Sequence, residues 1–433
     1  MRVLHYTIGF PPKRSGGLPL YAIDLMNEQV KQGHEVFALY PGRINIVKKL
    51  PYIKKAREKA VPNVIVYELV NSLPLPLFGG IKSPDHFMVK VDLKLYKDFL
   101  ATLDVDIIHI HTLMGLHKEF FEISKKNGIK IIYTSHDYFG LSPVPDFYLD
   151  GKSWDEENTN EFWNRSAKKA MSTNRIRIFQ LSFYPMIRKV IRKIKGTRES
   201  KKYISTKSIF ENNTSTDTID FSNLKKYYNS IFGLVDIFHF NSEVSMDVYL
   251  RNIPNLNEKN YEVISITNAS ISNVCKKRKT PYSVKRIAYI GPYQENKGFY
   301  DFLDFAKRNK NRGYNFLLFG GDKSYSVPSY IENKGRYLHS EIENIFPSID
   351  LILIPSLWKE TFGFLTLEAL SYGTAVMVSK NVGSGMLIDT SMIFDDLKEV
   401  EIPNEIFPFP IFVKTMSEHA KEIVKLYGRE IEN

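Results

Sequence analysis

Two glutamates flank a predicted turn from strand to helix in the second half of the chain. Glu360 lies just before the turn, and Glu368 lies eight residues on, about two helical turns away. Leu351 to Ile354 has the apolar composition of a buried strand, and Phe364 to Ser371 has that of a helix stopping at Tyr372-Gly373. Carboxylates so placed can accept hydrogen bonds from two parts of one ligand, such as a sugar and a ribose.

The turn between the two glutamates predicts an anion site. In a parallel βαβ unit the helix N-terminus lies beside the carboxyl ends of the strands, at the crevice where open α/β sheets bind ligands. The free backbone N–H groups around Phe362, Gly363 and Phe364 then point into that crevice. The plain structural alternative is a capped helix with a surface glutamate at each end.

A lysine and a glycine pair occupy similar positions on two other predicted strand-to-helix loops. Lys297 follows the strand Arg286 to Ile290, where an ammonium can neutralise a diphosphate leaving group. Gly16 and Gly17 follow the strand Val3 to Ile8, where the missing Cβ atoms let a ligand approach the backbone. A tight turn would explain the two glycines equally well.

Histidines mark the ends of two further predicted strands. His109 and His111 alternate with apolar residues in a buried strand, so both should face one side of the sheet. His136 follows the strand Ile129 to Ser135 at its carboxyl end, where chemistry is expected. The first two resemble a metal pair, but the sequence places no third ligand beside them, and no metal site is predicted.

These motifs resemble the retaining family 4 glycosyltransferases of the GT-B fold. One part of the resemblance is the Glu360/Glu368 spacing followed by the small-residue turn 372–374. The other is the segment 133–154, which is similar to the T-H-D-Y-F-G-L-C-P segment of one bacterial branch, with Ser142 where that branch has cysteine. The resemblance is strongest over residues 283–388 and 129–152.

The resemblance implies an α/β fold of two Rossmann-like domains facing a cleft. Residues 1–275 would form the acceptor-side domain with a basic insertion at 155–222, and residues 283–411 the domain that binds the nucleotide sugar. Residues 412–433 would form a helix that crosses back to the first domain. The nucleotide diphosphate sugar would be the donor substrate, and neither a cofactor nor a metal is expected.

The resemblance also implies roles for individual residues. His136 and Glu360 would contact the transferred sugar, Lys297 the diphosphate and Glu368 the ribose. The implied donor-site residues are Gly16, Gly17, Lys297, Thr361, Phe362, Gly363, Phe364 and Glu368. The family's phosphate-binding arginine is missing, because Pro292 follows Gly291, and Lys323 is a candidate replacement.

Composition limits the class of protein. At 433 residues the chain is long enough for two domains, and 43% hydrophobic with 25% charged residues is typical of a soluble globular protein. The single cysteine, Cys275, excludes an internal disulfide framework and fits a cytoplasmic protein. Neither a signal peptide nor a membrane span is predicted.

The net charge of +11 is concentrated in one segment. Residues 165–202 contain thirteen Lys or Arg and one acid, Glu199. Within this segment, Phe183 to Ile194 places apolar residues on one helical face and cations on the other. Such a helix suits an anionic membrane surface. The second interpretation is a helix packed on the core, and the third, nucleic-acid binding, has no motif to support it.

The predicted function is sugar transfer, with retention, from a nucleotide diphosphate sugar to a hydroxyl of a saccharide or lipid-linked saccharide. The expected setting is bacterial exopolysaccharide, capsule or lipid-linked oligosaccharide assembly, with the enzyme peripheral on the inner face of the plasma membrane. A nucleotide-sugar epimerase of the same fold and a non-catalytic partner subunit are the alternatives. The sugar, the base, the acceptor and the oligomeric state are left open.

Overall fold

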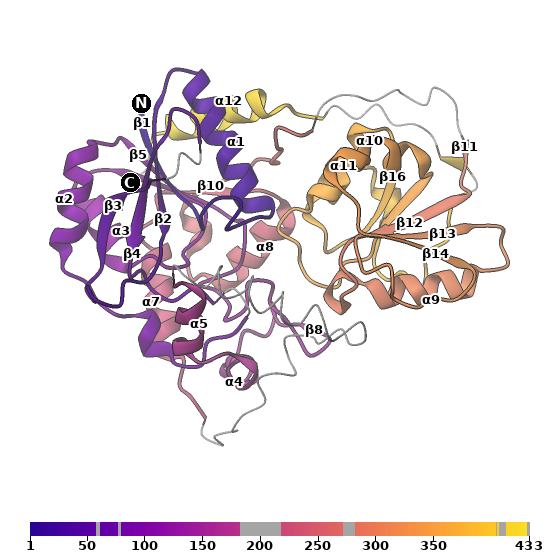
Figure 1. The fold of residues 1–433 in the computed structure, drawn as a ribbon, viewed down its shortest axis with the longest axis horizontal. Helices are drawn as coiled ribbons and strands as arrows, with labels where there is room; N and C mark the ends of the chain where they lie inside the picture. Colours follow the sequence, from indigo (N-terminus) through magenta and orange to yellow (C-terminus); the bar gives the residue numbers. More distant parts are fainter. Residues whose placement is uncertain are drawn as a thin grey trace.

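A computed structural model describes residues 1–57, 61–76, 79–181, 218–271, 282–403, 405–406 and 413–430. The chain forms two α/β domains, each built on its own sheet (Figure 1). The first sheet has the strand order β10-β9-β6-β5-β1-β2-β4-β3, and the second has the order β14-β13-β12-β15-β16-β17. Neighbouring strands are parallel throughout, except that β3 runs antiparallel to β4. The predicted fold of two Rossmann-like domains is thereby confirmed.

The elements of the first domain alternate between strands and helices. Its sheet contains β1 (Arg2–Tyr6), β2 (Glu35–Pro41), β3 (Tyr52–Lys55), β4 (Ile65–Val70), β5 (Ile107–Ile110), β6 (Lys130–Thr134), β9 (Ile237–Phe240) and β10 (Asn260–Val263). Its helices are α1 (Gly17–Lys31), α2 (Leu93–Leu103), α3 (Lys118–Lys126), α4 (Asn160–Lys169), α5 (Thr173–Phe179), α7 (Ser222–Phe232) and α8 (Glu243–Asn252). A short hairpin, β7 (Tyr148–Leu149) and β8 (Lys152–Ser153), projects from it.

The second domain is smaller. Its sheet contains β12 (Arg286–Ile290), β13 (Asn315–Phe319), β14 (Ile331–Gly335), β15 (Leu351–Ile354), β16 (Ala375–Ser379) and β17 (Ile393–Phe394). Its helices are α9 (Phe299–Asn309), α10 (Ile342–Ile345) and α11 (Phe364–Ser371). A separate ribbon pairs β11 (Tyr282–Ser283) with β18 (Glu405–Ile406).

At three places in the two sheets, an aspartate directly before a strand fastens that strand to its neighbour. The carboxylates of Asp106, Asp236 and Asp350 precede β5, β9 and β15. They accept the backbone N–H of Arg2 at 2.8 Å, of Ile131 at 2.8 Å and of Arg286 at 2.9 Å, respectively. Because each acceptor lies at the amino end of its strand, the carboxyl ends are left for loops that carry functional residues.

The chain returns to the first domain through α12 (Met416–Tyr427), which lies beside α1 (Figure 1). Thr415 caps this helix in a reciprocal capping box with Glu418, so the helix begins at Met416 rather than at the predicted residue 412. The Lys130 ammonium donates to the carbonyl oxygens of Tyr427 at 2.8 Å and Arg429 at 2.6 Å. The predicted crossing helix is confirmed.

Two segments differ from what their residue pattern alone would indicate. Residues 89–103 have a helical pattern, but the helix begins at Leu93, because Asp92 caps it by accepting the backbone N–H of Lys94 at 2.9 Å. Residues 337–338 have the pattern of a short strand, but β14 at Ile331–Gly335 pairs with β13 instead. The basic helix predicted over 183–194 lies outside the described residues.

Within the part of the chain that the structure describes, no helix has both the length and the apolar character that spanning a membrane requires.

Asp350 provides a test of the strand fastening. Its carboxylate accepts the backbone N–H groups of Lys285 and Arg286 and pairs with the Arg286 guanidinium at 2.9 Å. We expect Asp350→Ala to lower the free energy of unfolding by about 1–3 kcal/mol, because two backbone N–H groups and the Arg286 guanidinium lose their acceptor. Urea unfolding measures this. Asp350→Asn keeps an acceptor oxygen and should lose less, and equal losses for the two variants would contradict the role of the backbone bonds.

Candidate active site

Loops that follow the carboxyl ends of strands in both sheets meet at a seam between the domains. The Ser242 hydroxyl donates to the carbonyl oxygen of Thr361 at 2.5 Å. The Thr361 hydroxyl in turn donates to the carbonyl oxygen of His136 at 3.1 Å. Asn296 donates to the carboxylate of Asp146 at 3.1 Å. The seam therefore brings together the predicted residues from the loops after β6, β12 and β15.

Two of the predicted site residues form an ion pair at this seam. The Lys297 ammonium lies 2.9 Å from a carboxylate oxygen of Glu360, and the side chains are 29% and 10% exposed. The same ammonium lies 4.8 Å from the ring centroid of Trp358, a favourable position for a cation. Because little water reaches the pair, the two charges attract each other more strongly than an exposed pair would.

The N-terminus of α11 lies against the same carboxylate. Gly363 is the N-cap residue with a φ of 93°, and no side chain caps the helix. A Cβ atom on Gly363 would lie 3.2 Å from the second carboxylate oxygen of Glu360. The first-turn N–H groups of α11 have no acceptor within the helix, so an anion at this point meets free donors and the positive end of the helix dipole.

A glycine-containing loop holds this segment in place. The backbone N–H of Glu360 donates to the carbonyl oxygen of Asn381 at 2.8 Å, and the N–H groups of Gly383 and Ser384 donate back to Glu360 at 3.1 Å and Phe362 at 2.7 Å. A Cβ atom on Gly383 would lie 2.4 Å from the carbonyl oxygen of Thr361. Only glycine fits at this position, and the loop fixes the path of the chain from 360 to 363.

Phe362 and Phe364, both predicted as site residues, also pack between the two domains. The ring of Phe362 is 2% exposed and packs into a core cluster with Tyr21 of the first domain. The ring of Phe364 lies about 3.1 Å from the position that a Cβ atom on Gly17 would occupy. Gly16 is the N-cap residue of α1, with a φ of 125°. The rings thus pack between the domains while the backbone of Phe364 starts α11.

Glu368 lies farther along α11, apart from the ion pair. Burial raises the pKa of Glu368 to about 7. The nearby Tyr337 hydroxyl has a pKa raised to about 12 by its own burial and by the charge of Glu368. Glu368 is therefore a carboxyl group that changes charge near neutral pH, next to a hydroxyl that stays protonated.

His136 and Asp137 occupy the first-domain side of the seam. The His136 ring nitrogen Nε2 lies 3.2 Å from Nδ1 of His111, and burial lowers the pKa of His136 to about 3. Burial raises the pKa of Asp137 to about 6, although the carboxylate accepts the N–H of Phe139 at 2.9 Å and the Thr112 hydroxyl at 3.1 Å. The loop after β6 thus carries a neutral imidazole, His136, directly followed by a carboxyl group that can titrate, Asp137.

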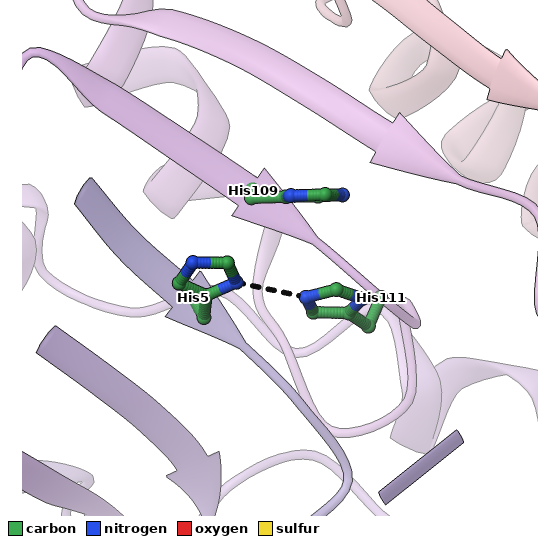
Figure 2. Close-up of side chains that lie close together, drawn as sticks. All are labelled: His5, His109 and His111. Carbon is green, nitrogen blue, oxygen red and sulfur yellow. Dashed lines mark hydrogen bonds between the residues drawn. The ribbon is translucent and has the colours of Figure 1, made fainter. Parts of the chain in front are cut away.

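A third histidine, which the sequence alone does not place, lies beside His109 and His111. His5 of β1 lies in register with His109 of β5, and the three side chains converge (Figure 2). One ring nitrogen from each lies within 4.8 Å of the others, all buried. Both ring nitrogens of each of the three histidines, however, already have a hydrogen-bond partner. The arrangement therefore fits a hydrogen-bonded network better than a metal centre.

Trp358, Ser242 and Asn296 are seam residues that the sequence analysis did not select. Trp358 was detectable as an aromatic residue directly before the predicted ligand loop, whereas the other two depend on how the domains meet. Lys323, proposed as a replacement cation, is exposed in the turn after β13. The carbonyl oxygen of Pro292 accepts the Tyr289 hydroxyl at 2.6 Å, which fixes the turn that lacks the arginine.

Comparison with known proteins places each domain separately. The family model described as Glycosyltransferase Family 4 matches residues 15–194, and the model described as Glycosyl transferases group 1 matches residues 284–399. The chain is a GT-B glycosyltransferase of family 4. This glycosyltransferase is 22% identical, over 342 residues, to an uncharacterized 42.6 kDa protein in the cps region of Klebsiella pneumoniae. The match covers 75% of this chain and 71% of that protein.

A solved structure shares the fold of this glycosyltransferase. The α,α-trehalose 6-phosphate synthase of Burkholderia multivorans superposes with a TM-score of 0.50 at 10% identity, covering 99% of this chain and 89% of the other. The sucrose-phosphate synthase of Thermosynechococcus elongatus gives a TM-score of 0.49 at 11% identity, covering 98% and 90%.

The ion pair at the seam predicts a characteristic pattern of stability. We expect Lys297→Met to lower the free energy of unfolding by about 1–3 kcal/mol, because the buried Glu360 carboxylate loses its partner. Adding Glu360→Gln should recover most of that loss, because no unpaired charge remains. Urea unfolding of the two single variants and the double variant measures the coupling. Additive losses in the double variant would show that the two side chains do not interact.

Proposed function

We propose that this glycosyltransferase moves a sugar from a nucleotide diphosphate sugar to an acceptor hydroxyl with retention at the anomeric carbon. The observation that carries the proposal is the Lys297–Glu360 pair beside the uncapped N-terminus of α11. A diphosphate offers negative charge to both the ammonium and the helix N–H groups. When it takes Lys297 as its partner, the Glu360 carboxylate is released to accept hydrogen bonds from sugar hydroxyls.

The proposed chemistry depends on stabilising the leaving group. As the bond between the anomeric carbon and the phosphate oxygen breaks, negative charge grows on the diphosphate, where Lys297 and the α11 N-terminus are already in place. The acceptor hydroxyl attacks from the face that the diphosphate leaves and gives its proton to the leaving phosphate, which yields retention. In this proposal His136 contacts the sugar, Glu368 contacts the ribose, and no metal is required.

A role in polysaccharide assembly is the second part of the proposal. The relative from Klebsiella pneumoniae is named for a cps region, which supports surface-polysaccharide biosynthesis as the setting. The acceptor would then be a saccharide or a lipid-linked saccharide at the inner face of the membrane.

Incubating the purified protein with a panel of nucleotide sugars, with and without bacterial membranes, tests the function. We expect transfer from one donor only when an acceptor is present, and NMR of the product should show the anomeric configuration of the donor. Lys297→Ala should lower kcat/KM by an amount equivalent to ~2–4 kcal/mol. Conversion of donor without acceptor would indicate an epimerase, and binding without turnover a non-catalytic subunit. A product of opposite configuration would refute retention.

The pKa of Glu368 predicts how nucleotide affinity depends on pH. Ribose hydroxyls donate to the ionised carboxylate, so binding favours loss of the proton that Glu368 carries below pH 7. Affinity should therefore rise as pH increases toward about 7 and level off above it. Calorimetry with the free nucleotide measures this. Glu368→Gln should flatten that rise and Glu368→Ala should weaken binding at every pH, and unchanged affinity in Glu368→Ala would remove the ribose assignment.

The basic segment predicts binding to anionic vesicles. We expect sedimentation with vesicles to require anionic lipid, to weaken with salt, and to fall when Arg188, Lys189, Arg192 and Lys193 are changed to glutamine. The matched control changes four exposed cations elsewhere, Lys97, Lys126, Lys307 and Lys310, to glutamine and should keep its binding. Equal binding by both quadruple variants at low salt would exclude the membrane surface as the partner of this segment.

A further inference from the structure

Six of the ten histidines of the chain gather around the central strands of the first domain. His5, His109 and His239 lie on β1, β5 and β9, and His111 and His136 follow β5 and β6. The sixth, His419, comes from α12. The proposed site uses only His136, although the ring of His111 lies within hydrogen-bonding distance of it (Figure 2 shows His111 with His5 and His109).

Eight hydrogen bonds join eight side chains and one backbone carbonyl group into one continuous chain. The inner half, which starts at the seam, consists of the bonds His136 Nε2 with His111 Nδ1 (3.2 Å), His111 Nε2 with His5 Nδ1 (2.9 Å), His5 Nε2 with Gln29 Oε1 (2.7 Å), and Gln29 Nε2 with the Tyr427 hydroxyl (2.9 Å). The outer half consists of the bonds from the Tyr427 hydroxyl to His109 Nδ1 (2.6 Å), His109 Nε2 to the Thr134 hydroxyl (2.6 Å), the Thr134 hydroxyl to His239 Nδ1 (2.9 Å), and His239 Nε2 to the carbonyl oxygen of Ile264 (2.8 Å).

The far end of this chain sets the direction of every bond in its outer half. The carbonyl oxygen of Ile264 can only accept, so His239 carries its proton on Nε2, and its Nδ1 accepts from Thr134. The single Thr134 proton is then used, so the Thr134 oxygen accepts from His109 Nε2. His109 Nδ1 must therefore accept the proton of the Tyr427 hydroxyl.

The bond directions in the inner half of the chain follow from the same assignment of donors and acceptors. The Tyr427 oxygen accepts from the Gln29 amide N–H, which turns the amide oxygen of Gln29 toward His5. His5 therefore donates from Nε2 and accepts at Nδ1 from His111. His111 then accepts at its own Nδ1 from Nε2 of His136.

Each histidine ring has one donor and one acceptor nitrogen because the rings are neutral. Burial lowers the pKa of His5 to about 4 and of His136 to about 3, and it lowers the pKa values of His109, His111 and His239 well below their usual range. A neutral imidazole has one N–H and one acceptor nitrogen, so each ring passes the direction of its bond to the next.

We propose that this one-directional chain of hydrogen bonds fixes His136 in the tautomer protonated at Nε2, so that its Nδ1 meets the donor sugar as a hydrogen-bond acceptor. Gln29, Tyr427 and Thr134 are then positioning residues for the transfer reaction, although none of them lies at the seam. The specificity part of this inference rests on the proposed function. An acceptor nitrogen favours a sugar with a hydroxyl at that position and disfavours one with a carboxylate, which cannot donate at neutral pH.

Tyr427 is the most informative position to change. Tyr427→Phe keeps the ring but removes the hydroxyl, so nothing then distinguishes the two orientations of the Gln29 amide. With the amide reversed, His5, His111 and His136 would each carry their proton on Nδ1. The variant should therefore populate both tautomers of His136, even though the change is made at a residue that does not contact it.

The matched control is Tyr21→Phe. The Tyr21 hydroxyl is also buried, and its ring lies 4.7 Å from that of His136, but the hydroxyl bonds to His419 Nε2 at 2.8 Å, outside the chain. This variant removes a comparable hydroxyl from a closer residue. It should leave the tautomer of His136 unchanged.

Nitrogen-15 NMR of the ligand-free protein with labelled histidine tests the proposal, with the His136 signals assigned by their loss in His136→Gln. We expect Nε2 protonated and Nδ1 unprotonated in the unmodified protein and in Tyr21→Phe, and a mixture in Tyr427→Phe. Thr134→Val breaks the same chain with a side chain of similar shape and serves if Tyr427→Phe does not fold. Protonation at Nδ1 in the unmodified protein, or no change in the folded chain-breaking variants, would overturn the proposal.

A kinetic measurement separates this proposal from the proposed function. If transfer is found, Tyr427→Phe should lower kcat/KM for the donor by about threefold to tenfold, the effect of weakening one hydrogen bond. The KM of the acceptor should stay unchanged. If no donor supports transfer, the proposed function fails, while the NMR result on the ligand-free protein still decides the tautomer.

Discussion

An ammonium and a carboxylate meet 2.9 Å apart at the seam between the two domains, where neither is well hydrated. Removing Lys297 leaves the Glu360 carboxylate, which is 10% exposed, without its partner, and this state is far less favourable than the pair. The surrounding residues are constrained by this pair: Trp358 lies beside the ammonium, and Gly363 leaves room for the carboxylate.

The two sheets make such a seam possible. Each contains a buried aspartate, Asp236 or Asp350, that fastens the amino end of a strand, and each directs the loops at its carboxyl ends toward the other domain. Thr361 connects the two sides, since its carbonyl oxygen and its hydroxyl both bond to first-domain groups. The loop that contains Thr361 is therefore positioned by both domains, not by its own sheet alone.

Much of this arrangement was predictable from local patterns. Apolar runs predicted β5, β6, β12 and β15, and the helical composition of residues 364–371 with the stop at Tyr372-Gly373 predicted α11. Contacts between distant segments were not predictable. Placing His5 beside His109 requires the register between β1 and β5, and the bond between Gln29 and Tyr427 joins residues 398 positions apart. The burial of Phe362 likewise depends on how the domains meet.

The return of α12 to the first domain has a consequence for the order of folding. Ile423 and Tyr427 belong to the same core cluster as Val3 and Leu25, so α12 packs against β1 and α1 although the entire second domain separates them in the sequence. Until α12 has been synthesised and has docked, the apolar groups that it covers on the first domain stay uncovered. The packing of the first domain is therefore completed only after the second domain has been made.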